Sequence, residues 1–376
     1  MFKKKYGGKF TMQKKLLIGL LSLTIGLMFI VYTGFNAYAA ETVPPTIDKA
    51  LKAEIKASID KGLKYLNEHQ EKNGSYENYP GITALVATAY MKSPKHYTEK
   101  DGVQVKEAIK YLLTMVKPDG GIYDEDLPNY NTSLGILALN ETKNPAYKTI
   151  IQNAQKTIMG YQVTESGDMY GGIGYSDDDP RPDLSNLKFS LQALKESGVP
   201  NDSDVWAKAA KFIERCQNRT ESNDSPSASD DGGFIYRPGF SQAGDDPQGK
   251  PKSYGSMTYA GILSFIYANV DKNDPRVQDA VKWVQTHYTL DENPGMGQQG
   301  LYYYYHTMAK AFKAYGKPVI TDSDGVQHNW YAELAKKIIK NQKPDGSWVN
   351  PEDRWFESKP VLVTAYAILA LSIGYE

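Results

Sequence analysis

The chain has 376 residues, with 43 Lys and Arg against 44 Asp and Glu, and 41 % of its residues are hydrophobic. This composition excludes a disordered, a collagen-like or a multi-span membrane protein, and the balanced charge gives no reason to expect a nucleic acid as partner. A single cysteine, Cys216, excludes an intramolecular disulfide and a thiolate-rich metal cluster. The 28 tyrosines, against 11 Phe and 5 Trp, are the one compositional excess.

The N-terminal segment has the pattern of an export signal. Residues 1–15 carry six lysines and no acid, an apolar run follows from Leu16 to Tyr32, and Ala37-Tyr38-Ala39 offers a cleavage site of small residues. We therefore predict a signal peptide over residues 1–39 and a secreted or cell-envelope protein. An uncleaved membrane anchor is the alternative, because roughly 17 apolar residues are borderline for spanning a bilayer. Without this segment the chain keeps 44 acidic residues against 37 basic ones, which argues further against anionic polymers as ligands.

Residues 40–376 are predicted to form one domain of six repeats, which begin near residues 50, 104, 150, 204, 276 and 329. Each repeat has an amphipathic helical stretch, a glycine turn, and a second helical stretch that is apolar on most faces. The amphipathic stretch is clear at Val105, Ile109, Leu112 and Val116, whose spacing is that of one buried stripe on an α-helix. The glycine turns contain Gly74, Gly120, Gly171, Gly232, Gly297 and Gly346.

The second stretches should be buried on both sides, whereas the amphipathic stretches bury one side only. They cover residues 82–91, 133–139, 184–194, 257–268, 302–312 and 361–371. Six inner and six outer helices joined by short turns predict an all-α fold, an (α/α)6 toroid of helical hairpins. An open solenoid is the alternative, but it would need polar capping repeats, and the last repeat ends apolar.

The glycine turns resemble those of a known superfamily. Residues 342–348, Gln-Lys-Pro-Asp-Gly-Ser-Trp, are similar to the Gln-x-x-Asp-Gly-Ser-Trp turn of squalene and oxidosqualene cyclases, and residues 70–76 are a degenerate copy. The Gly-Gly-Ile and Gly-Gly-Phe turns resemble those of the cyclases and of protein prenyltransferase β subunits. This resemblance covers about residues 50–374 and implies the terpenoid cyclase and prenyltransferase fold. The motif itself has a structural role, because its glutamine can bond helix-end backbone groups and its tryptophan can pack on the next helix.

The acidic residue that cyclases use as proton donor is not present at the matching position of this chain. Cyclases of this class protonate an alkene with an Asp-x-Asp-Asp motif at the start of an inner helix, and the aligned segment here is Asp183-Leu184-Ser185-Asn186. Ser185 stands at the proton-donating position, and a hydroxyl cannot supply a strong acid. Asp183 is interpreted either as the N-cap of its helix or as a carboxylate that faces a ligand.

The prenyltransferase zinc site is also incomplete. That site uses an Asp, a Cys and a His; the histidine segment is matched by Tyr305-His306-Thr307, but the cysteine position falls in residues 253–256, which have no thiol. Cys216 lies on the buried stripe of an outer helix instead. We therefore predict no metal and no cofactor, with His306 as a hydrogen-bonded wall residue.

The starts of the inner helices should surround one mouth of a central cavity. The residues predicted to line it are Tyr254, Tyr259, Tyr302, Tyr303, Tyr305, His306 and Asn186. Such a wall suits an isoprenoid chain with a polar head, or a sugar ring stacked on an aromatic face. Core packing with paired hydroxyls is the alternative interpretation of these tyrosines.

The sequence is compatible with three functions. The leading hypothesis is an exported, monomeric toroid that binds an apolar or amphiphilic, isoprenoid-like ligand without catalysis. The second is an enzyme on a terpenoid or on extracellular polysaccharide; an inverting glycosidase would need two carboxyls about 6.5 to 9.5 Å apart, for which Asp126 and Asp183 are the natural pair. The third is a cell-surface protein-interaction module that uses the convex face or the polar insertion at residues 218–252.

Overall fold

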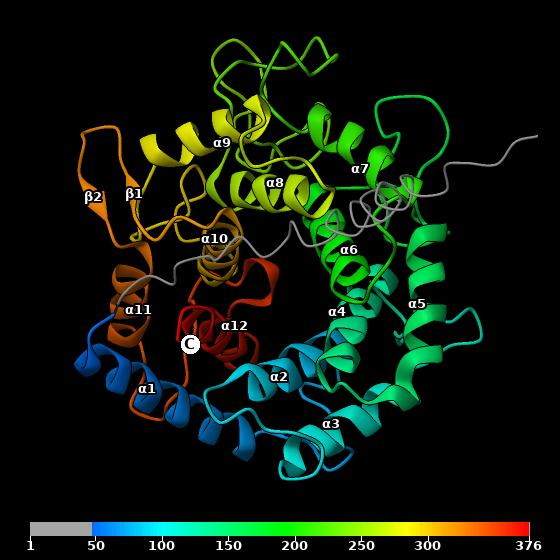
Figure 1. The fold of residues 1–376 in the computed structure, drawn as a ribbon, viewed down its shortest axis with the longest axis vertical. Coiled ribbons are helices and arrows are strands. Elements are labelled where there is room, and N and C mark those ends of the chain that lie inside the picture. Colours follow the sequence, from blue (N-terminus) through cyan, green and yellow to red (C-terminus); the bar gives the residue numbers. More distant parts are fainter. Residues whose placement is uncertain (1–46, 376) are drawn as a thin grey trace, which may run out of the picture. The chain divides into compact units, whose positions relative to one another are not determined.

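The computed structural model describes residues 47–375, which lie within one compact unit, Thr42–Glu376. The predicted signal peptide lies outside the described residues. Within them, twelve α-helices alternate between an outer and an inner position along the chain (Figure 1). The outer helices are α1 (Lys49–Glu68), α3 (Val103–Thr114), α5 (Lys148–Gly160), α7 (Asp204–Arg215), α9 (Pro275–Thr286) and α11 (Trp330–Lys340). The inner helices are α2 (Pro80–Lys92), α4 (Pro128–Glu141), α6 (Leu184–Glu196), α8 (Gly255–Tyr267), α10 (Leu301–Tyr315) and α12 (Pro360–Ser372).

The inner helices form a closed ring. Each one packs against the next, and α12 packs against α2, so the last hairpin meets the first. The outer helices surround this ring, with α3 against α2 and α1 against α12 (Figure 1). Two 3-10 turns, η1 (Pro145–Tyr147) and η2 (Arg354–Phe356), and a two-stranded sheet of β1 (Ile320–Thr321) and β2 (Gln327–His328) complete the described elements. No helix within residues 47–375 is long and apolar enough to cross a membrane.

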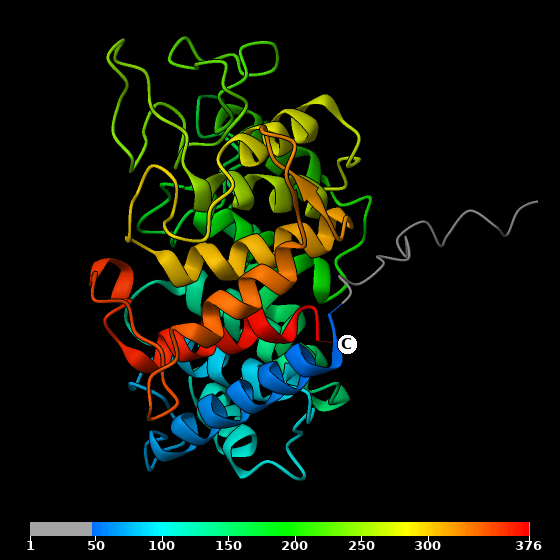
Figure 2. The ribbon, with the colours of Figure 1, turned by 90° about the vertical axis from the view of Figure 1, so that its left-hand side faces the viewer.

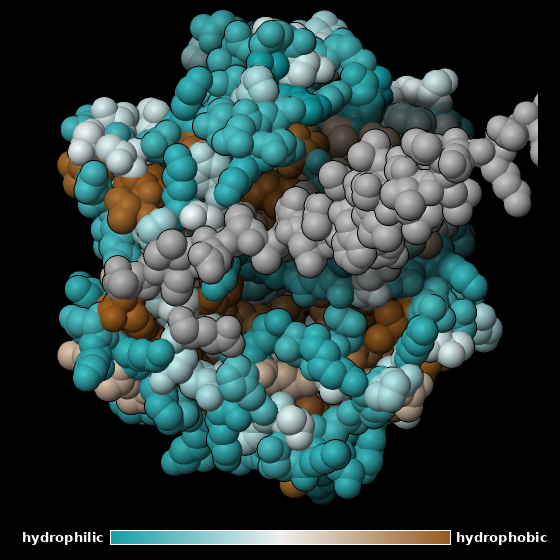
Figure 3. Space-filling view, viewed as in Figure 1, coloured by the Kyte–Doolittle hydropathy of each residue, from teal (hydrophilic) through white to brown (hydrophobic). Residues whose placement is uncertain are grey.

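Burial separates the two sets of helices as the hydrophobic patterns predict. Helix α12 buries nearly every residue from Val361 to Ser372, because it lies between α10 and α2 and is covered by α1. Helix α3 buries only Val105, Ala108, Ile109, Tyr111 and Leu112, which form its inward stripe. Hydrophilic residues accordingly cover most of the coloured surface in the view of Figure 3, and hydrophobic residues show in smaller patches among them.

The last glycine turn closes the ring. Gln342 Nε2 donates to the carbonyl oxygens of Gly346 and Ser58, each at 2.9 Å, and the Ser58 hydroxyl donates to Gln342 Oε1 at 2.9 Å. Gly346 has φ +92°, and a Cβ there would lie 2.5 Å from the carbonyl oxygen of Lys61 on α1. The turn can therefore approach α1 only with glycine at this position.

Three other glutamines make the same link between neighbouring repeats. Gln70, Gln162 and Gln217 each donate to a carbonyl of their own glycine turn and to a carbonyl of the next outer helix. We call these three and Gln342 the linking glutamines. The resemblance predicted the glutamine contact with helix backbone. A second contact was not predicted: inner-helix threonines such as Thr364 accept a hydrogen bond from the backbone amide that follows the turn.

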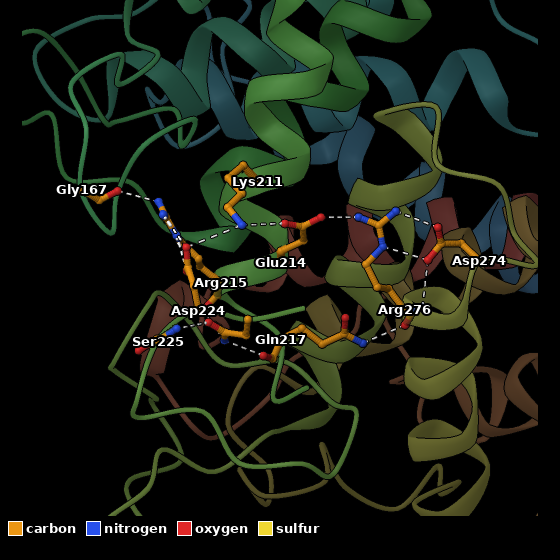
Figure 4. A network of polar contacts seen from close by, with 10 residues as sticks. Gly167, Lys211, Glu214, Arg215, Gln217, Asp224, Ser225, Asp274 and Arg276 are labelled. Atoms are coloured by element: carbon orange, nitrogen blue, oxygen red, sulfur yellow. Dashed lines mark hydrogen bonds and ion pairs between the residues drawn. The ribbon is translucent and has the colours of Figure 1, made fainter. Parts of the chain in front are cut away.

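The insertion at residues 218–252 extends beyond the ring of helices (Figures 1 and 2). Figure 4 shows the polar network at its base. Arg215 on α7 binds both carboxylate oxygens of Asp224 in the insertion, at 2.8 and 2.9 Å. Arg276 on α9 binds Asp274 at 2.7 Å and also pairs with Glu214, so the network joins two outer helices to the insertion.

Candidate functional site: the central cavity

A cavity of about 370 Å³ lies at the end of the ring where the inner helices begin. Its wall includes apolar side chains from the inner helices, among them Ile82, Leu85, Leu134, Phe189 and Leu362. Seven tyrosines also line the cavity: Tyr79, Tyr130, Tyr175, Tyr236, Tyr254, Tyr303 and Tyr366. We call this space the tyrosine cavity.

Ser185 lies in the wall of the tyrosine cavity. The Tyr303 hydroxyl donates to Ser185 Oγ at 3.3 Å, and the Tyr130 hydroxyl makes a short hydrogen bond with the same oxygen. Ser185 is also the residue that the sequence resemblance matched to the proton donor of the cyclases. The position that holds an acid in those enzymes is therefore occupied here by a cluster of hydroxyl groups.

Asp183 is the N-cap of α6. Its Oδ1 accepts the Asn186 amide at 2.9 Å, so the N-cap interpretation is confirmed. The side chain is buried and is not part of the cavity wall. Burial raises the pKa of Asp183 above its ordinary value, while hydrogen bonds from the Tyr175 hydroxyl, the Asn186 amide and the Tyr236 hydroxyl oppose that rise.

Asp126 lies elsewhere, on the exposed loop before α4. Its Oδ1 accepts the Tyr79 hydroxyl at 2.9 Å. Neither Asp126 nor Asp183 is in the wall of the tyrosine cavity. The structure therefore does not set this predicted pair of carboxyls across the cavity, because the helix amides of α6 hold one of them and the other lies in solvent.

Of the predicted wall tyrosines, Tyr254 and Tyr303 line the cavity and three others do not. Tyr259 is buried between α8 and α10, with its ring 5.1 Å from that of Phe312. Tyr302 and Tyr305 pack on each other, and the Tyr305 hydroxyl donates to the Leu290 carbonyl at 2.5 Å, on the outer side of α10. These three rings are buried and pack against neighbouring side chains. For Tyr302 and Tyr305 the reason is that residues 302–305 span a helical turn, so that only one position faces the axis.

Asn186 and His306 also lie outside the wall of the tyrosine cavity. Asn186 is buried, and neither Oδ1 nor Nδ2 of its side chain has a hydrogen-bond partner among the described residues. His306 stacks on Tyr366 with ring centroids 5.4 Å apart and lines a second cavity. His306 is therefore a wall residue of a cavity, but its Nδ1 has no hydrogen-bond partner among residues 47–375.

The sequence did not single out Glu357, a buried carboxylate in the wall. Glu357 Oε1 accepts the Tyr303 amide at 2.8 Å and Oε2 accepts the Tyr302 amide at 3.2 Å, so this side chain caps α10 from a distant segment. Asn350 Nδ2 donates to Oε2 at 2.7 Å. Burial raises the pKa of Glu357, and these hydrogen bonds oppose the rise. No local pattern could have revealed a cap that lies more than fifty residues from its helix.

The mouth of the cavity has an exposed aromatic edge. Trp355 and Phe356 are 39 % and 51 % exposed and have φ of 60° and 64°, a backbone region that large side chains rarely adopt. The Arg354 guanidinium lies 4.5 Å from the centre of the Trp355 ring. Lys359 pairs with Glu77 at 2.7 Å beside them. Strained, exposed aromatic residues at a cavity mouth are typical of a ligand entrance.

Metal-binding groups are not found in the part of the chain that the structure describes. No cluster of three or more His, Cys, Asp or Glu side chains there could hold an ion. Cys216 is buried at the end of α7, and burial raises its pKa well above the ordinary value. Its thiol is therefore held away from the tyrosine cavity in the neutral form.

Fold and cavity together define the class: an α/α toroid with a central, tyrosine-lined pocket. No protein-family model and no curated protein sequence matches the chain. Among solved structures, a variant of the type II terpene cyclase MstE from Scytonema, in complex with geranylgeranyl dihydroxybenzoate, is similar with a TM-score of 0.57 and 13 % identity, over 88 % of this chain and 99 % of that one.

Two further solved structures are similar at the same level. A protein from Actinoplanes has a TM-score of 0.52 and 16 % identity over 86 % of this chain and 100 % of its own. A possible member of the GH105 family from Salmonella enterica has a TM-score of 0.54 and 13 % identity over 86 % of this chain and 94 % of its own. These similarities show the α/α toroid fold that the repeats and glycine turns predicted.

Proposed function

We propose that the protein binds an apolar or amphiphilic, isoprenoid-like ligand in the tyrosine cavity and does not catalyse proton-initiated cyclisation. The composition of the wall carries this proposal. Its apolar side chains offer contact area for a hydrocarbon chain, and its tyrosines add flat faces with hydroxyls for a polar head. A volume of about 370 Å³ falls within the range of small-molecule sites.

The absence of cyclisation is argued from Ser185. This hydroxyl is shared by Tyr130 and Tyr303 at the position of the cyclase acid. Asp183, at the start of the same helix, accepts the Asn186 amide and is not in the wall. Glu357 is a buried carboxyl that is in the wall, and its oxygens accept the α10 amides of Tyr302 and Tyr303. A ligand bound beside Ser185 would meet hydroxyl groups that can orient it but cannot protonate an alkene.

The experiment is a calorimetric titration of the full chain with geranylgeraniol. Leu362 and Leu369 are both 6 % exposed on α12, but Leu362 lines the tyrosine cavity and Leu369 lines the second one. Leu362→Trp should fill the tyrosine cavity and weaken binding at least tenfold, whereas Leu369→Trp should leave it unchanged. Equal effects of the two substitutions, or turnover of squalene by the unmodified protein, would refute the proposal.

Export through residues 1–39 is part of the same proposal and rests on the charge and hydrophobicity pattern of the sequence. Its test is intact-mass measurement of the protein recovered from the native cell envelope or culture medium. Cleavage after Ala39 is expected. A mass that includes the lysine-rich segment would instead favour the uncleaved anchor.

An enzyme on extracellular polysaccharide is the second candidate. One observation favours it: the Glu77 and Glu357 carboxylates are both in the wall of the tyrosine cavity, and aromatic rings surround them. The measurement is release of reducing or unsaturated sugar ends from bacterial polysaccharides by the full chain. Activity that Glu357→Gln removes and Asp126→Asn does not would establish this candidate in place of the binding function.

A further inference from the structure

A second cavity, of about 360 Å³, lies at the opposite end of the ring, where the inner helices end. Leu85, Leu134 and Phe189 line both cavities, so these three side chains form the partition between them. Leu137 and Leu369 add further apolar wall on the far side. The deep part of this second space can therefore accommodate a hydrocarbon group.

Basic side chains distinguish the second cavity, and we call it the basic cavity. Lys92, Lys310, Lys313 and His306 line it. Two glutamates balance part of this charge, because Lys92 pairs with Glu141 at 2.7 Å and Lys310 lies 3.6 Å from Glu196. The tyrosine cavity, in contrast, is lined by one lysine, which is paired with Glu77.

Helix ends explain only part of this basic cluster. Lys92 and Lys313 lie in the last turns of α2 and α10, where a cation is favoured by the helix dipole. Lys188 and His306 lie in the first halves of α6 and α10, so the dipole gives no reason for a positive charge there. Another explanation is needed for these two.

Lys188 lies behind Phe189, one of the side chains between the two cavities, and its Nζ is 5.0 Å from the ring centre of Tyr303 in the tyrosine cavity. The side chain is 0 % exposed, and its Nζ lies 3.2 Å from the ring centre of Phe189, with no hydrogen-bond partner among the described residues. Burial and the charge of Lys310 lower the pKa of Lys188, and burial, Lys188 and Lys310 lower the pKa of His306. The basic groups thus repel one another, and no carboxylate is among the causes that act on Lys188 or His306.

Two buried atoms in the wall also lack partners. His306 is 4 % exposed and Gln192 is 5 % exposed, and both line the basic cavity. His306 Nδ1 and Gln192 Oε1 have no hydrogen-bond partner within residues 47–375. Buried polar atoms are nearly always paired in native structures, so the unpaired His306 Nδ1 is available to a ligand in this cavity. Gln192 Oε1 accepts hydrogen bonds only, so it would pair with a donor such as water and not with an anion.

We propose that the basic cavity binds a small amphiphilic carboxylate, whose charged group lies beside Lys310 and His306 and whose apolar part packs on Leu137 and Leu369. A carboxylate can accept hydrogen bonds from both a lysine and an imidazole while it reduces their mutual repulsion. The apolar partition favours a hydrocarbon tail over an inorganic anion. This site is separate from the tyrosine cavity, so the proposal of carboxylate binding does not depend on the function proposed above.

Sodium octanoate is the probe, titrated calorimetrically into the full chain. Lys310→Met should weaken octanoate binding at least tenfold, because it removes a charge from the wall and keeps the length of the side chain. Lys282→Met, which removes an exposed lysine paired with Asp279 on α9, should leave binding within twofold. Leu369→Trp should abolish binding by filling the apolar part of the cavity.

Each control can overturn the proposal. If octanol binds as tightly as octanoate, the charged group has no role in binding. If acetate or phosphate binds as tightly as octanoate, the hydrocarbon tail has no role in binding. Competition between octanoate and geranylgeraniol would place octanoate in the tyrosine cavity. Thermal unfolding followed by circular dichroism identifies any variant that has lost its fold, and unchanged binding in two folded variants, Lys310→Met and Leu369→Trp, would reject the site.

Discussion

Replacement of Gln342 by leucine tests whether the linking glutamine closes the ring. The side chain makes three hydrogen bonds, two as donor to the carbonyls of Gly346 and Ser58 and one as acceptor from the Ser58 hydroxyl. Each intramolecular hydrogen bond contributes about 1 kcal/mol to stability. Leucine keeps the approximate volume but none of the bonds, so Gln342→Leu should lower the free energy of unfolding by about 3 kcal/mol.

The assay is urea unfolding followed by circular dichroism at 222 nm, with extrapolation to water. Lys343→Ala is the matched control, because Lys343 is the next residue, is exposed, and contributes only its backbone to the turn. It should change the unfolding free energy by less than about 0.5 kcal/mol. A loss below about 1 kcal/mol for Gln342→Leu would refute the view that this side chain stabilises the closed ring.

Three further predictions concern a turn, an ion pair and the thiol. Gly171→Ala should destabilise the fold by more than about 1 kcal/mol in the same urea assay, because φ is +84° and a Cβ would lie 1.8 Å from the Lys208 carbonyl oxygen. The Arg215 side chain lowers the pKa of Asp224 from 3.8 to about 2, so the stabilisation from this pair is present above pH 4 and is lost as the pH falls through 2. The difference in free energy of unfolding between the unmodified protein and Asp224→Asn should therefore shrink over that range. A difference that stays constant would contradict this prediction. Cys216, buried with a raised pKa, should react with a thiol reagent at pH 8 only in urea, and fast labelling of the folded protein would contradict its burial.

Most of the helical architecture could be predicted from the sequence because its signals are local. The apolar stripe that includes Val105 and Ile109 predicts which side of α3 is buried. The mostly apolar stretch from Val361 to Leu371 predicts that α12 is buried on nearly every side. The glycine turns then fix where each hairpin bends. Such patterns need no knowledge of distant contacts, so they identify the six hairpins directly.

The cavity was harder to predict, since its wall depends on contacts between segments that are far apart. The run Tyr302 to Tyr305 indicated that some ring faces the axis, but the rotation of α10 about its own axis is set by packing against α8 and α12, and it selects Tyr303. Tyr175 and Tyr236 reach the wall from loops, where no periodicity exists to read. Glu357 joins the site because it caps a helix that precedes it in the chain.

The contact of Gln342 with Ser58 also constrains the order of assembly, because its two partners are separated by 284 positions in the chain. Neighbouring hairpins can pair as soon as each is made, since their links span only one repeat. The seam between α12 and α2 cannot form until both ends of the domain are available, and it must close the longest loop in the fold. During synthesis, which begins at the N-terminus, the helical hairpins therefore form an open arc. The apolar surfaces at its ends stay exposed until the sixth hairpin is made.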